Sequence, residues 1–300
     1  MFLENFLLPL DQERRLISVR MAQNAGPLGY VDDVYPCGLF PEKGLARLDF
    51  SRITILCGGN GSGKSTLLNL IASRLNLGRI APCNQGETWD LYVNACQYAL
   101  CRNEEGRKVT IPEGSRIITS DDVFDFMLAI RSNNSEITEA KEEAKQDWMK
   151  LNYGKTVKMR GMEDYERLRA QALACRKSVS RRQFIRQTAG SEVRLGSNGE
   201  TALEYFDSRL EPNQLYCLDE PENSLAPPLQ LRLLEIIEQL ARFCGCQFIL
   251  ATHSPFLLSL HGAKIYDLDA RPVTLKKWWE LENVRTWYAF FEKNRSLFEN

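Results

Sequence analysis

The chain has 300 residues, enough for one large or two small domains with a substantial core. Its formal net charge of −1 gives no overall field that would favour nucleic acid or a membrane surface. Nine cysteines without a C-x-x-C pair argue against a zinc module and suit a reducing cytoplasm. No apolar run reaches the roughly 20 residues of a membrane span and no signal peptide is evident, so we expect a cytoplasmic protein without membrane contact.

The first 56 residues predict strands separated by a loop. Residues 1–10 form a short apolar segment that is either a docking arm or a first edge element. Alternation of apolar and polar residues predicts strands at Leu16–Met21 and Leu45–Phe50, while residues 24–41, rich in Gly, Pro and aromatic residues, predict a loop. We expect the two strands to form an antiparallel flank ahead of a buried strand at Ile53–Leu56.

A glycine-rich loop follows that buried strand and opens a helix-forming stretch. Residues 57–66 fit the pattern G-x-x-x-x-G-K-[ST] without a mismatch. The glycines let backbone N–H groups turn inward around phosphate oxygens, and the helix N-terminus adds its positive end. Lys64 can then reach the β- and γ-phosphates of ATP, and Ser65 can bind Mg²⁺. The predicted nucleotide-binding residues are Gly58, Gly59, Asn60, Gly61, Ser62, Gly63, Lys64, Ser65 and Thr66.

The pattern after that helix becomes β-like and then helical. Strands are predicted at Trp89–Val93, Lys108–Ile111 and Arg116–Thr119. Residues 120–122, Ser-Asp-Asp, can cap a helix at Val123–Arg131.

Residues 132–193 predict a helical subdomain whose charge changes sign along its length. The segment 136–147 is acidic, and 150–194 is basic. The basic residues include Lys155, Lys158, Arg160, Arg167, Arg169, Arg176, Lys177, Arg181, Arg182 and Arg186. A solvated helical face is one interpretation of this charge. A surface for nucleic acid or a partner protein is the other.

The C-terminal third alternates strands and helices. Strands are predicted at Leu215–Glu220, Gln247–His253 and Ala263–Leu268, with helices at Leu229–Phe243 and Trp278–Phe298. Such alternation after a phosphate-binding loop implies a mainly parallel α/β sheet.

Two acidic residues end the first of these strands, which is the Walker B arrangement. Asp219 would hold Mg²⁺, and Glu220 would polarise the attacking water. The segment Pro-Glu-Asn-Ser-Leu follows at 221–225, and Ala-Thr-His-Ser-Pro occupies 251–255.

This order of motifs resembles ABC-type ATPases. It looks like the soluble RecF/SMC-like branch, and most like small stand-alone predicted AAA/ABC ATPases. The resemblance covers roughly residues 45–130 and 190–300. It implies an α/β fold: an ABC-type P-loop NTPase sheet with an antiparallel β flank and an inserted helical subdomain. The expected parts are a Walker A lobe (1–131), the helical insert (132–193), and a half with the signature, Walker B, D-loop and H-loop (194–300).

The resemblance also implies roles for single residues. Residues 195–200, Leu-Gly-Ser-Asn-Gly-Glu, look like the signature loop, so Ser197 and Gly199 would bind the γ-phosphate held by a second copy. Residues 222–225 would be the D-loop, and His253 the switch histidine. His261 is expected to be structural.

The family's Q-loop glutamine has no clear counterpart. Residues 119–122 occupy the corresponding turn, and Gln97 is a weaker substitute. Tyr30 or Tyr35 would supply the aromatic ring that stacks on adenine.

The expected function is ATP hydrolysis by a homodimer that encloses two MgATP molecules, with Lys64, Glu220 and His253 as catalytic residues. An ATPase subunit of a bacterial defence or DNA-maintenance complex fits best. It would have an effector protein as partner and could contact nucleic acid through the basic insert. The alternatives are the ATP-binding subunit of a transporter and a nucleotide-gated scaffold with little turnover.

Overall fold

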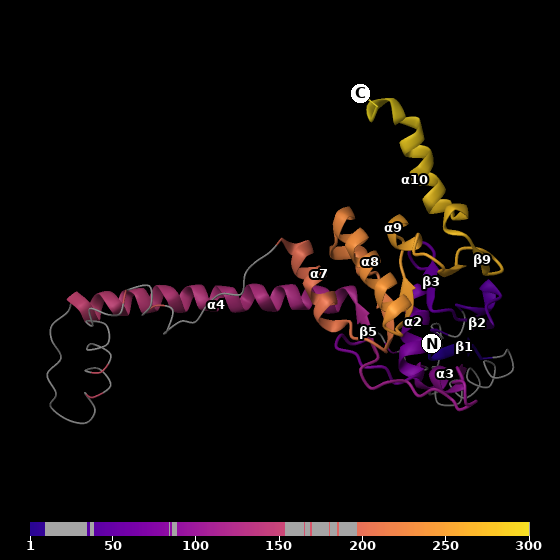
Figure 1. Cartoon of the computed structure of the whole chain (residues 1–300), viewed down its shortest axis with the longest axis horizontal. Helices are drawn as coiled ribbons and strands as arrows, with labels where there is room; N and C mark the ends of the chain where they lie inside the picture. The colour runs from indigo at the N-terminus through magenta and orange to yellow at the C-terminus, as the bar shows by residue number, and fades with distance from the viewer. Residues whose placement is uncertain are drawn as a thin grey trace, which may run out of the picture. The chain divides into compact units, whose positions relative to one another are not determined.

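The computed structural model describes residues 1–9, 35–36, 39–83, 85, 89–153, 165, 169, 180, 185 and 197–299. The chain divides into two compact units, one of Met1–Phe124 with Asn198–Asn300 and one of Asp125–Ser197 (Figure 1). The strand predicted at Leu16–Met21 and most of the predicted insert lie outside the described residues. The proposed domain boundaries therefore remain a prediction.

A six-stranded sheet organises the first unit, in the order β5-β6-β7-β3-β8-β9. Every neighbouring pair is parallel except β8 and β9, which are antiparallel. The central strands β3, β6 and β7 are buried along their whole length, as their runs of aliphatic residues predict. The strands are β3 (Ile53–Cys57), β5 (Arg116–Thr119), β6 (Leu215–Asp219), β7 (Gln247–Ala251), β8 (Lys264–Asp267) and β9 (Thr274–Lys276).

A three-stranded antiparallel sheet flanks the first, in the order β2-β1-β4. Its strands are β1 (Leu3–Leu7), β2 (Arg47–Asp49) and β4 (Gln97–Leu100). The apolar N-terminal segment is thus the middle strand of this flank and not an edge element. The buried amide of Gln247 joins the two sheets, because it accepts from the N–H groups of Phe2 and Leu3 and donates to the Leu3 carbonyl.

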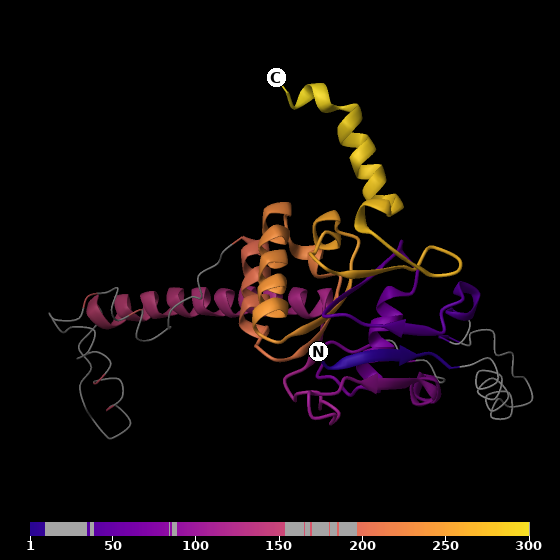
Figure 2. The same ribbon diagram turned by 45° about the vertical axis from the view of Figure 1, so that its right-hand side comes forward.

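The helices of the first unit pack on the parallel sheet and on one another. Helix α2 (Lys64–Arg74) contacts β5, β6 and β7 and lies beside α3 (Trp89–Ala95). The main core includes residues of β1, α2, α3 and the central strands. Helix α8 (Pro227–Phe243) contacts α7 (Asn198–Arg209) and α9 (Pro255–Leu258), as Figure 2 shows. A last helix, α10 (Glu282–Lys293), follows the short 3₁₀ turn η4 (Trp278–Glu280).

Three predicted elements differ from the structure. Trp89–Val93 belongs to a helix, α3, because Trp89, Tyr92 and Val93 lie on one helical face and are buried together. In the segment 108–111 only Lys108 makes a bridge, with Arg102. The helix predicted at Val123–Arg131 begins earlier and ends later, as α4 (Ser120–Tyr153).

Helix α4 contributes to both units. Its first five residues belong to the first unit, and the residues from Asp125 to Tyr153 belong to the second. Ion pairs three residues apart, Lys145 with Glu142 and Lys150 with Asp147, line its exposed surface. No helix in the described part of the chain combines the length and the apolar composition that a bilayer span requires.

Candidate functional site

The glycine-rich loop joins β3 to α2 at the carboxyl edge of the parallel sheet. Gly61 and Gly63 have φ of 76° and 94°, in the left-handed region that glycine adopts at little cost. A Cβ atom on Gly63 would also lie 2.8 Å from Leu39 Cδ2. The backbone therefore needs glycine at this turn, and the N-terminal end of α2 begins directly after it, at Lys64.

The ammonium group of Lys64 lies inside this loop. Its side chain is 4% exposed, and Nζ donates to the carbonyl oxygens of Gly58 at 2.9 Å and Gly59 at 3.1 Å. Glu220 Oε1 lies 3.8 Å from the same nitrogen. The positive charge is thus held where the loop would receive the phosphates.

Ser65 and Asp219 meet at the next position. Ser65 Oγ donates to Asp219 Oδ1 at 3.0 Å. Asp219 ends β6 between Thr119 of β5 and Ala251 of β7, so the sheet register fixes its place. Burial raises the pKa of Asp219 to about 6, and the hydrogen bond from Ser65 opposes that shift only in part. A nearby cation would favour the ionised form.

Glu220 has a strained backbone. Its φ of 47° and ψ of 52° lie in the left-handed region, which is uncommon for residues other than glycine and concentrates at functional sites. Its Oε2 accepts from the Asn223 amide at 2.9 Å, and its Oε1 lies 2.9 Å from His253 Nε2. Burial favours the neutral acid, but the contacts with Asn223, His253 and Lys64 outweigh it and lower the pKa of Glu220. The carboxylate is therefore ionised and oriented.

Both ring nitrogens of His253 face acceptors. Nε2 meets the Glu220 carboxylate, and Nδ1 lies 3.2 Å from the carbonyl oxygen of Gly58. A neutral imidazole can donate to only one of them. The His253 ring therefore bridges the glycine-rich loop and Glu220.

A second carboxylate, that of Glu222, fixes the segment that carries His253. Glu222 belongs to the 3₁₀ turn η3 (Pro221–Ser224). Its Oε1 accepts from the Thr252 hydroxyl at 2.7 Å and from the N–H groups of His253 at 2.8 Å and Ser254 at 3.2 Å. The turn after Glu220 and the turn after β7 are thus linked through one oxygen atom.

We expect Glu222→Ala to lower the kcat of ATP hydrolysis by about 10–100-fold while changing the KM for ATP little, because His253 loses its backbone support. Glu222→Gln, which keeps an acceptor oxygen, should be intermediate. Steady-state phosphate release measures both parameters, and Glu235→Ala on the exposed side of α8 is the matched control. A large rise in KM with unchanged kcat would assign Glu222 to binding instead.

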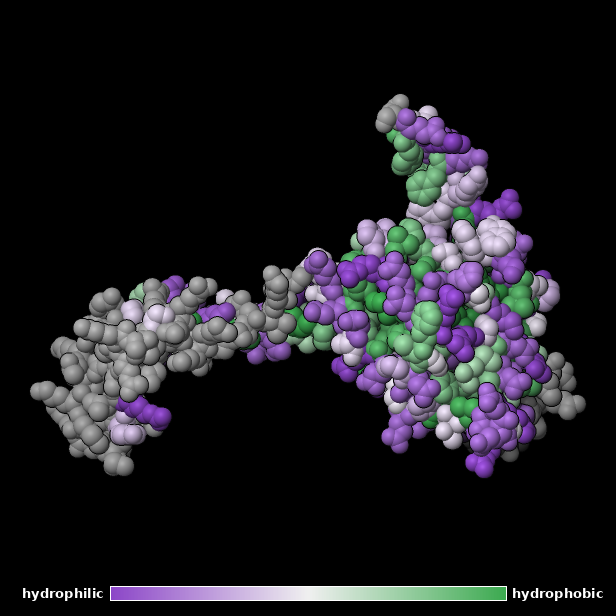
Figure 3. Space-filling view, in the orientation of Figure 1, coloured by the Kyte–Doolittle hydropathy of each residue, from purple (hydrophilic) through white to green (hydrophobic). Residues whose placement is uncertain are grey.

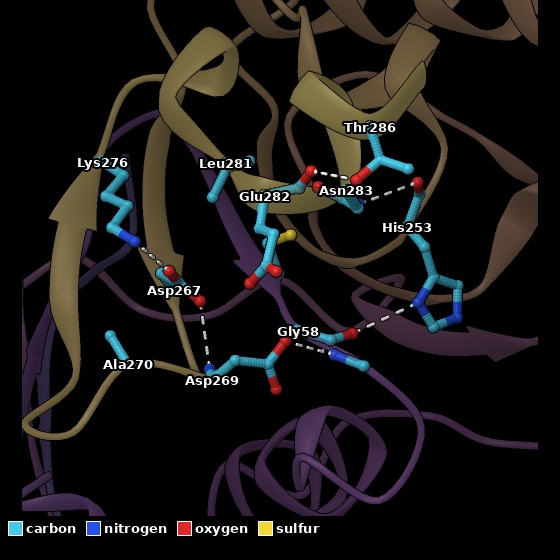
Figure 4. Close-up of a pocket in the computed structure, with 12 residues that line it drawn as sticks. Gly58, His253, Asp267, Asp269, Ala270, Lys276, Leu281, Glu282, Asn283 and Thr286 are labelled. Atoms are coloured by element: carbon cyan, nitrogen blue, oxygen red, sulfur yellow. Dashed lines mark hydrogen bonds and ion pairs between the residues drawn. The ribbon is translucent and has the colours of Figure 1, made fainter. Parts of the chain in front are cut away.

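A cavity of about 410 Å³ opens beside Gly58, Gly59 and His253 (Figure 4). Asp269 lines it and accepts from the Gly59 N–H at 2.7 Å, while Asn283 at the start of α10 donates to the His253 carbonyl at 3.4 Å. The other lining residues are Cys57, Asp267, Ala270, Lys276, Leu281, Glu282 and Thr286, and Lys276 pairs with Asp267 at 2.7 Å. The first turn of α10 therefore adjoins the nucleotide loop.

Sequence patterns did not reveal Lys43, which supports the loop from behind. Its buried ammonium donates to the carbonyl oxygens of Ser62 at 2.8 Å and Leu268 at 2.6 Å. Burial lowers the pKa of Lys43. The only sequence signal is a lysine after Pro41-Glu42 in a loop, and many exposed lysines share that context.

Comparison with family models decides the family. The model described as "ABC transporter" matches residues 47–223, more than half of the chain. The chain belongs to the ABC ATPase family. A second model, described as "AAA domain, putative AbiEii toxin, Type IV TA system", matches residues 197–259 of this ABC ATPase. No curated protein matches the chain.

Solved structures similar to this ABC ATPase include SMC heads and transporter cassettes. The SMC head domain from Thermotoga maritima is 13% identical with a TM-score of 0.40, covering 92% of this chain and 99% of that one. The cassette MJ0796 bound to ADP and Pi is 16% identical with a TM-score of 0.35, covering 74% and 83%. An Smc head bound to the C-winged helix domain of ScpA is 16% identical with a TM-score of 0.36, covering 80% and 94%.

Two predicted residues of the ABC signature lie at the start of α7. Ser197 is exposed and directly precedes the helix, and Gly199 lies in its first turn. A Cβ on Gly199 would lie 2.5 Å from Leu229 Cδ1 and 3.5 Å from the Ser224 carbonyl. Glycine thus permits close packing of α7 against Leu229 of α8, and the binding roles of Ser197 and Gly199 remain predictions.

The Q-loop candidates have different surroundings. Thr119 pairs in register with Asp219, so the turn at 119–122 reaches the nucleotide edge of the sheet. Asp122 is used structurally, since it accepts from the N–H groups of Thr119 and Ala81 at 2.7 Å each. Gln97 lies in β4 of the other sheet, which argues against it.

Of the two aromatic candidates for adenine stacking, Tyr35 lies in the described part of the chain. Tyr35 stacks on Trp89 and hydrogen bonds to the Thr66 hydroxyl at 2.8 Å. Tyr30 lies outside the described residues.

Proposed function

We propose that this ABC ATPase binds and hydrolyses MgATP and acts as a dimeric switch. The observation that carries the proposal is the Glu220 carboxylate. It is oriented by Asn223 and His253 and lies 3.8 Å from the Lys64 ammonium at the glycine-rich loop. An ionised, oriented base beside a phosphate-binding lysine supports turnover as well as binding.

The residues present fit magnesium. Ser65 Oγ and Asp219 Oδ1 are hard oxygen ligands, 3.0 Å apart, and Mg²⁺ takes one or two such protein ligands together with phosphate oxygens and water. The described residues contain no group of three or more His, Cys, Asp and Glu side chains that could hold a metal by themselves. When bound, Mg²⁺ would neutralise charge on the β- and γ-phosphates.

The proposed reaction is an in-line displacement at the γ-phosphorus. The N–H groups of the loop and Lys64 hold the phosphates, and Glu220 orients the water and takes its proton as the new P–O bond forms. The bond between the β-γ bridging oxygen and the γ-phosphorus breaks, and ADP leaves. His253, which lies between the glycine-rich loop and Glu220, would stabilise charge on the γ-phosphate oxygens once ATP is bound.

Two copies would complete two sites head to tail. Each site would take Lys64, Ser65, Asp219, Glu220 and His253 from one chain and Ser197 with Gly199 from the other. The exposure of Ser197 at a helix start supports this arrangement. Hydrolysis would then release the two copies from each other.

We place this switch in a bacterial defence or DNA-maintenance complex in the cytoplasm, as the ATPase subunit that acts on an effector protein. The match of residues 197–259 to a family described as a putative toxin of a toxin–antitoxin system favours that setting. Nucleic acid would bind the basic segment 150–194. The match of residues 47–223 to the "ABC transporter" model keeps a transporter subunit as the second candidate.

The direct test is phosphate release from MgATP by the purified chain, with and without double-stranded DNA. We expect turnover that disappears when Mg²⁺ is omitted and that rises when DNA is added. ATP binding without turnover under all these conditions would instead indicate a nucleotide-gated scaffold. Turnover that DNA leaves unchanged would argue against the DNA-linked role and leave the ATPase assignment in place.

A further inference from the structure

The C-terminal helix α10 projects from the body of the first unit (Figures 1 and 2). It carries an apolar stripe along one face. Val284, Trp287, Tyr288 and Phe291 have the spacing i, i+3, i+4, i+7, so they share one face of the helix. Val284 is buried, whereas Trp287 is 50% exposed and Tyr288 66% exposed. The same face is thus anchored at its base and open along the rest of its length.

Aromatic rings beside the stripe extend it, because Phe290 and Phe298 contact the ring of Phe291. Trp287 stacks on Phe291 with ring centroids 6.1 Å apart, and Phe291 contacts Phe290 and Phe298 edge-on at 5.6 and 6.0 Å. We call it the aromatic face, comprising Trp287, Tyr288, Phe290, Phe291, Leu297 and Phe298. Figure 3 shows apolar residues in green along one side of this helix and polar residues in purple along the other.

The exposed area of the aromatic face is large enough for a protein–protein contact. With large side chains of about 200 Å² each, roughly 60% exposed, it leaves about 700 Å² open. That exceeds the largest apolar patch of most monomers, about 300–600 Å². Two such faces pressed together would bury about 1,400 Å², within the range of specific protein–protein interfaces.

The charge of the C-terminal segment argues against a membrane or a nucleic acid as the partner of the aromatic face. The segment 282–299 has as many acids as bases: Glu282, Glu292 and Glu299 against Arg285, Lys293 and Arg295. A helix that binds an anionic membrane or nucleic acid has a basic polar side. Two neutral copies of this helix would not repel each other, and exposed Trp, Tyr and Phe are the residues that dominate protein interfaces.

We propose that the aromatic face binds the same face of a second copy, in a two-fold symmetric pair of α10 helices that forms without nucleotide. This contact is separate from the head-to-tail dimer that would enclose two MgATP molecules, and it does not depend on that dimer. It would hold two chains close enough to raise their effective concentration for ATP-driven closure. The base of α10 also touches the His253 segment through Asn283, so the pair would adjoin both nucleotide sites.

The test is the molecular mass of the full chain at micromolar concentrations in EDTA without nucleotide, by sedimentation equilibrium. We expect the natural sequence to be a dimer. The double variant Trp287→Ala/Phe291→Ala should have a dimer affinity at least about 100-fold weaker, since two central aromatic side chains are lost. The control is Phe243→Ala, which removes a ring that is 74% exposed from the end of α8 and should leave the dimer intact. Circular dichroism melting checks that each variant is folded.

Two results would overturn the proposal. One is a natural chain that stays monomeric without nucleotide, whether or not it binds vesicles or another protein. The other is a dimer that the double substitution leaves unchanged. The head-to-tail dimer around MgATP is tested separately. Glu220→Gln combined with the double substitution should still dimerise when MgATP is added.

Discussion

Glu220→Gln is expected to lower ATP turnover by about 10²–10³-fold while ATP still binds, because an amide cannot take the proton of the attacking water. The substitution keeps the side chain's size and one acceptor oxygen. It removes the negative charge that faces Lys64 at 3.8 Å and His253 at 2.9 Å. Single-turnover phosphate release measures the rate, and a fluorescent ATP analogue measures binding.

The same variant should also accumulate as a dimer with MgATP, since a switch that cannot hydrolyse cannot open. This is measured by light scattering on a chain that combines Glu220→Gln with Trp287→Ala/Phe291→Ala. The nucleotide-free contact is absent from that chain, so any dimer that forms depends on MgATP. Glu235→Gln, the same chemical change at an exposed position of α8, is the control and should retain full turnover. A Glu220→Gln chain that stays monomeric with ATP would count against the sandwich, and one that still hydrolyses would remove Glu220 from catalysis.

Local patterns were sufficient for the nucleotide loop and the strands around it. The glycines at 61 and 63, the lysine and the acidic end of β6 act over a few consecutive residues, so the sequence displays them directly. Parallel strands then bring Asp219 and the His253 segment to one edge through β6 and β7. The ABC-type α/β fold with its mainly parallel sheet was predicted correctly for this reason.

Elements that depend on pairing or packing with distant parts of the chain were harder to predict from the sequence. Leu3–Leu7 is the middle strand of the flank only because it pairs with Arg47–Asp49 and Gln97–Leu100, far along the chain. Trp89–Val93 has strand-forming residues, yet its buried positions 89, 92 and 93 have helical spacing. Propensity pointed to a strand there, and the periodicity would have given the helix.

The candidate site likewise combines residues that local patterns reveal with residues that depend on distant contacts. Asn223, which orients Glu220, lies only three residues away, but the hydrogen bond requires the left-handed backbone at Glu220. Glu222, Lys43 and Asp269 act on loops remote in sequence. Nothing in a single sequence distinguishes such charges, whether buried as Lys43 or exposed as Asp269, from charges that contact only solvent.

The head-to-tail site predicts complementation between two inactive chains. Lys64→Ala removes the phosphate contact from one chain's loop, and Ser197→Glu places a carboxylate where the partner's γ-phosphate would bind. Each variant alone should lose about 99% of turnover, since both sites of each homodimer are defective. A mixed dimer contains one site with an intact loop from the second variant and an intact signature from the first.

An equimolar mixture of the two variants should therefore recover about a quarter of the natural rate, because random pairing makes half the dimers mixed, with one working site in each. The control mixes Lys64→Ala with a chain carrying both substitutions, in which no site has an intact loop. Phosphate release measures all mixtures at the same total concentration. Full activity of Ser197→Glu alone would show that the signature serine is not needed. Absence of recovery, with mixed dimers demonstrated by mass, would show that a site is not divided between two chains in this way.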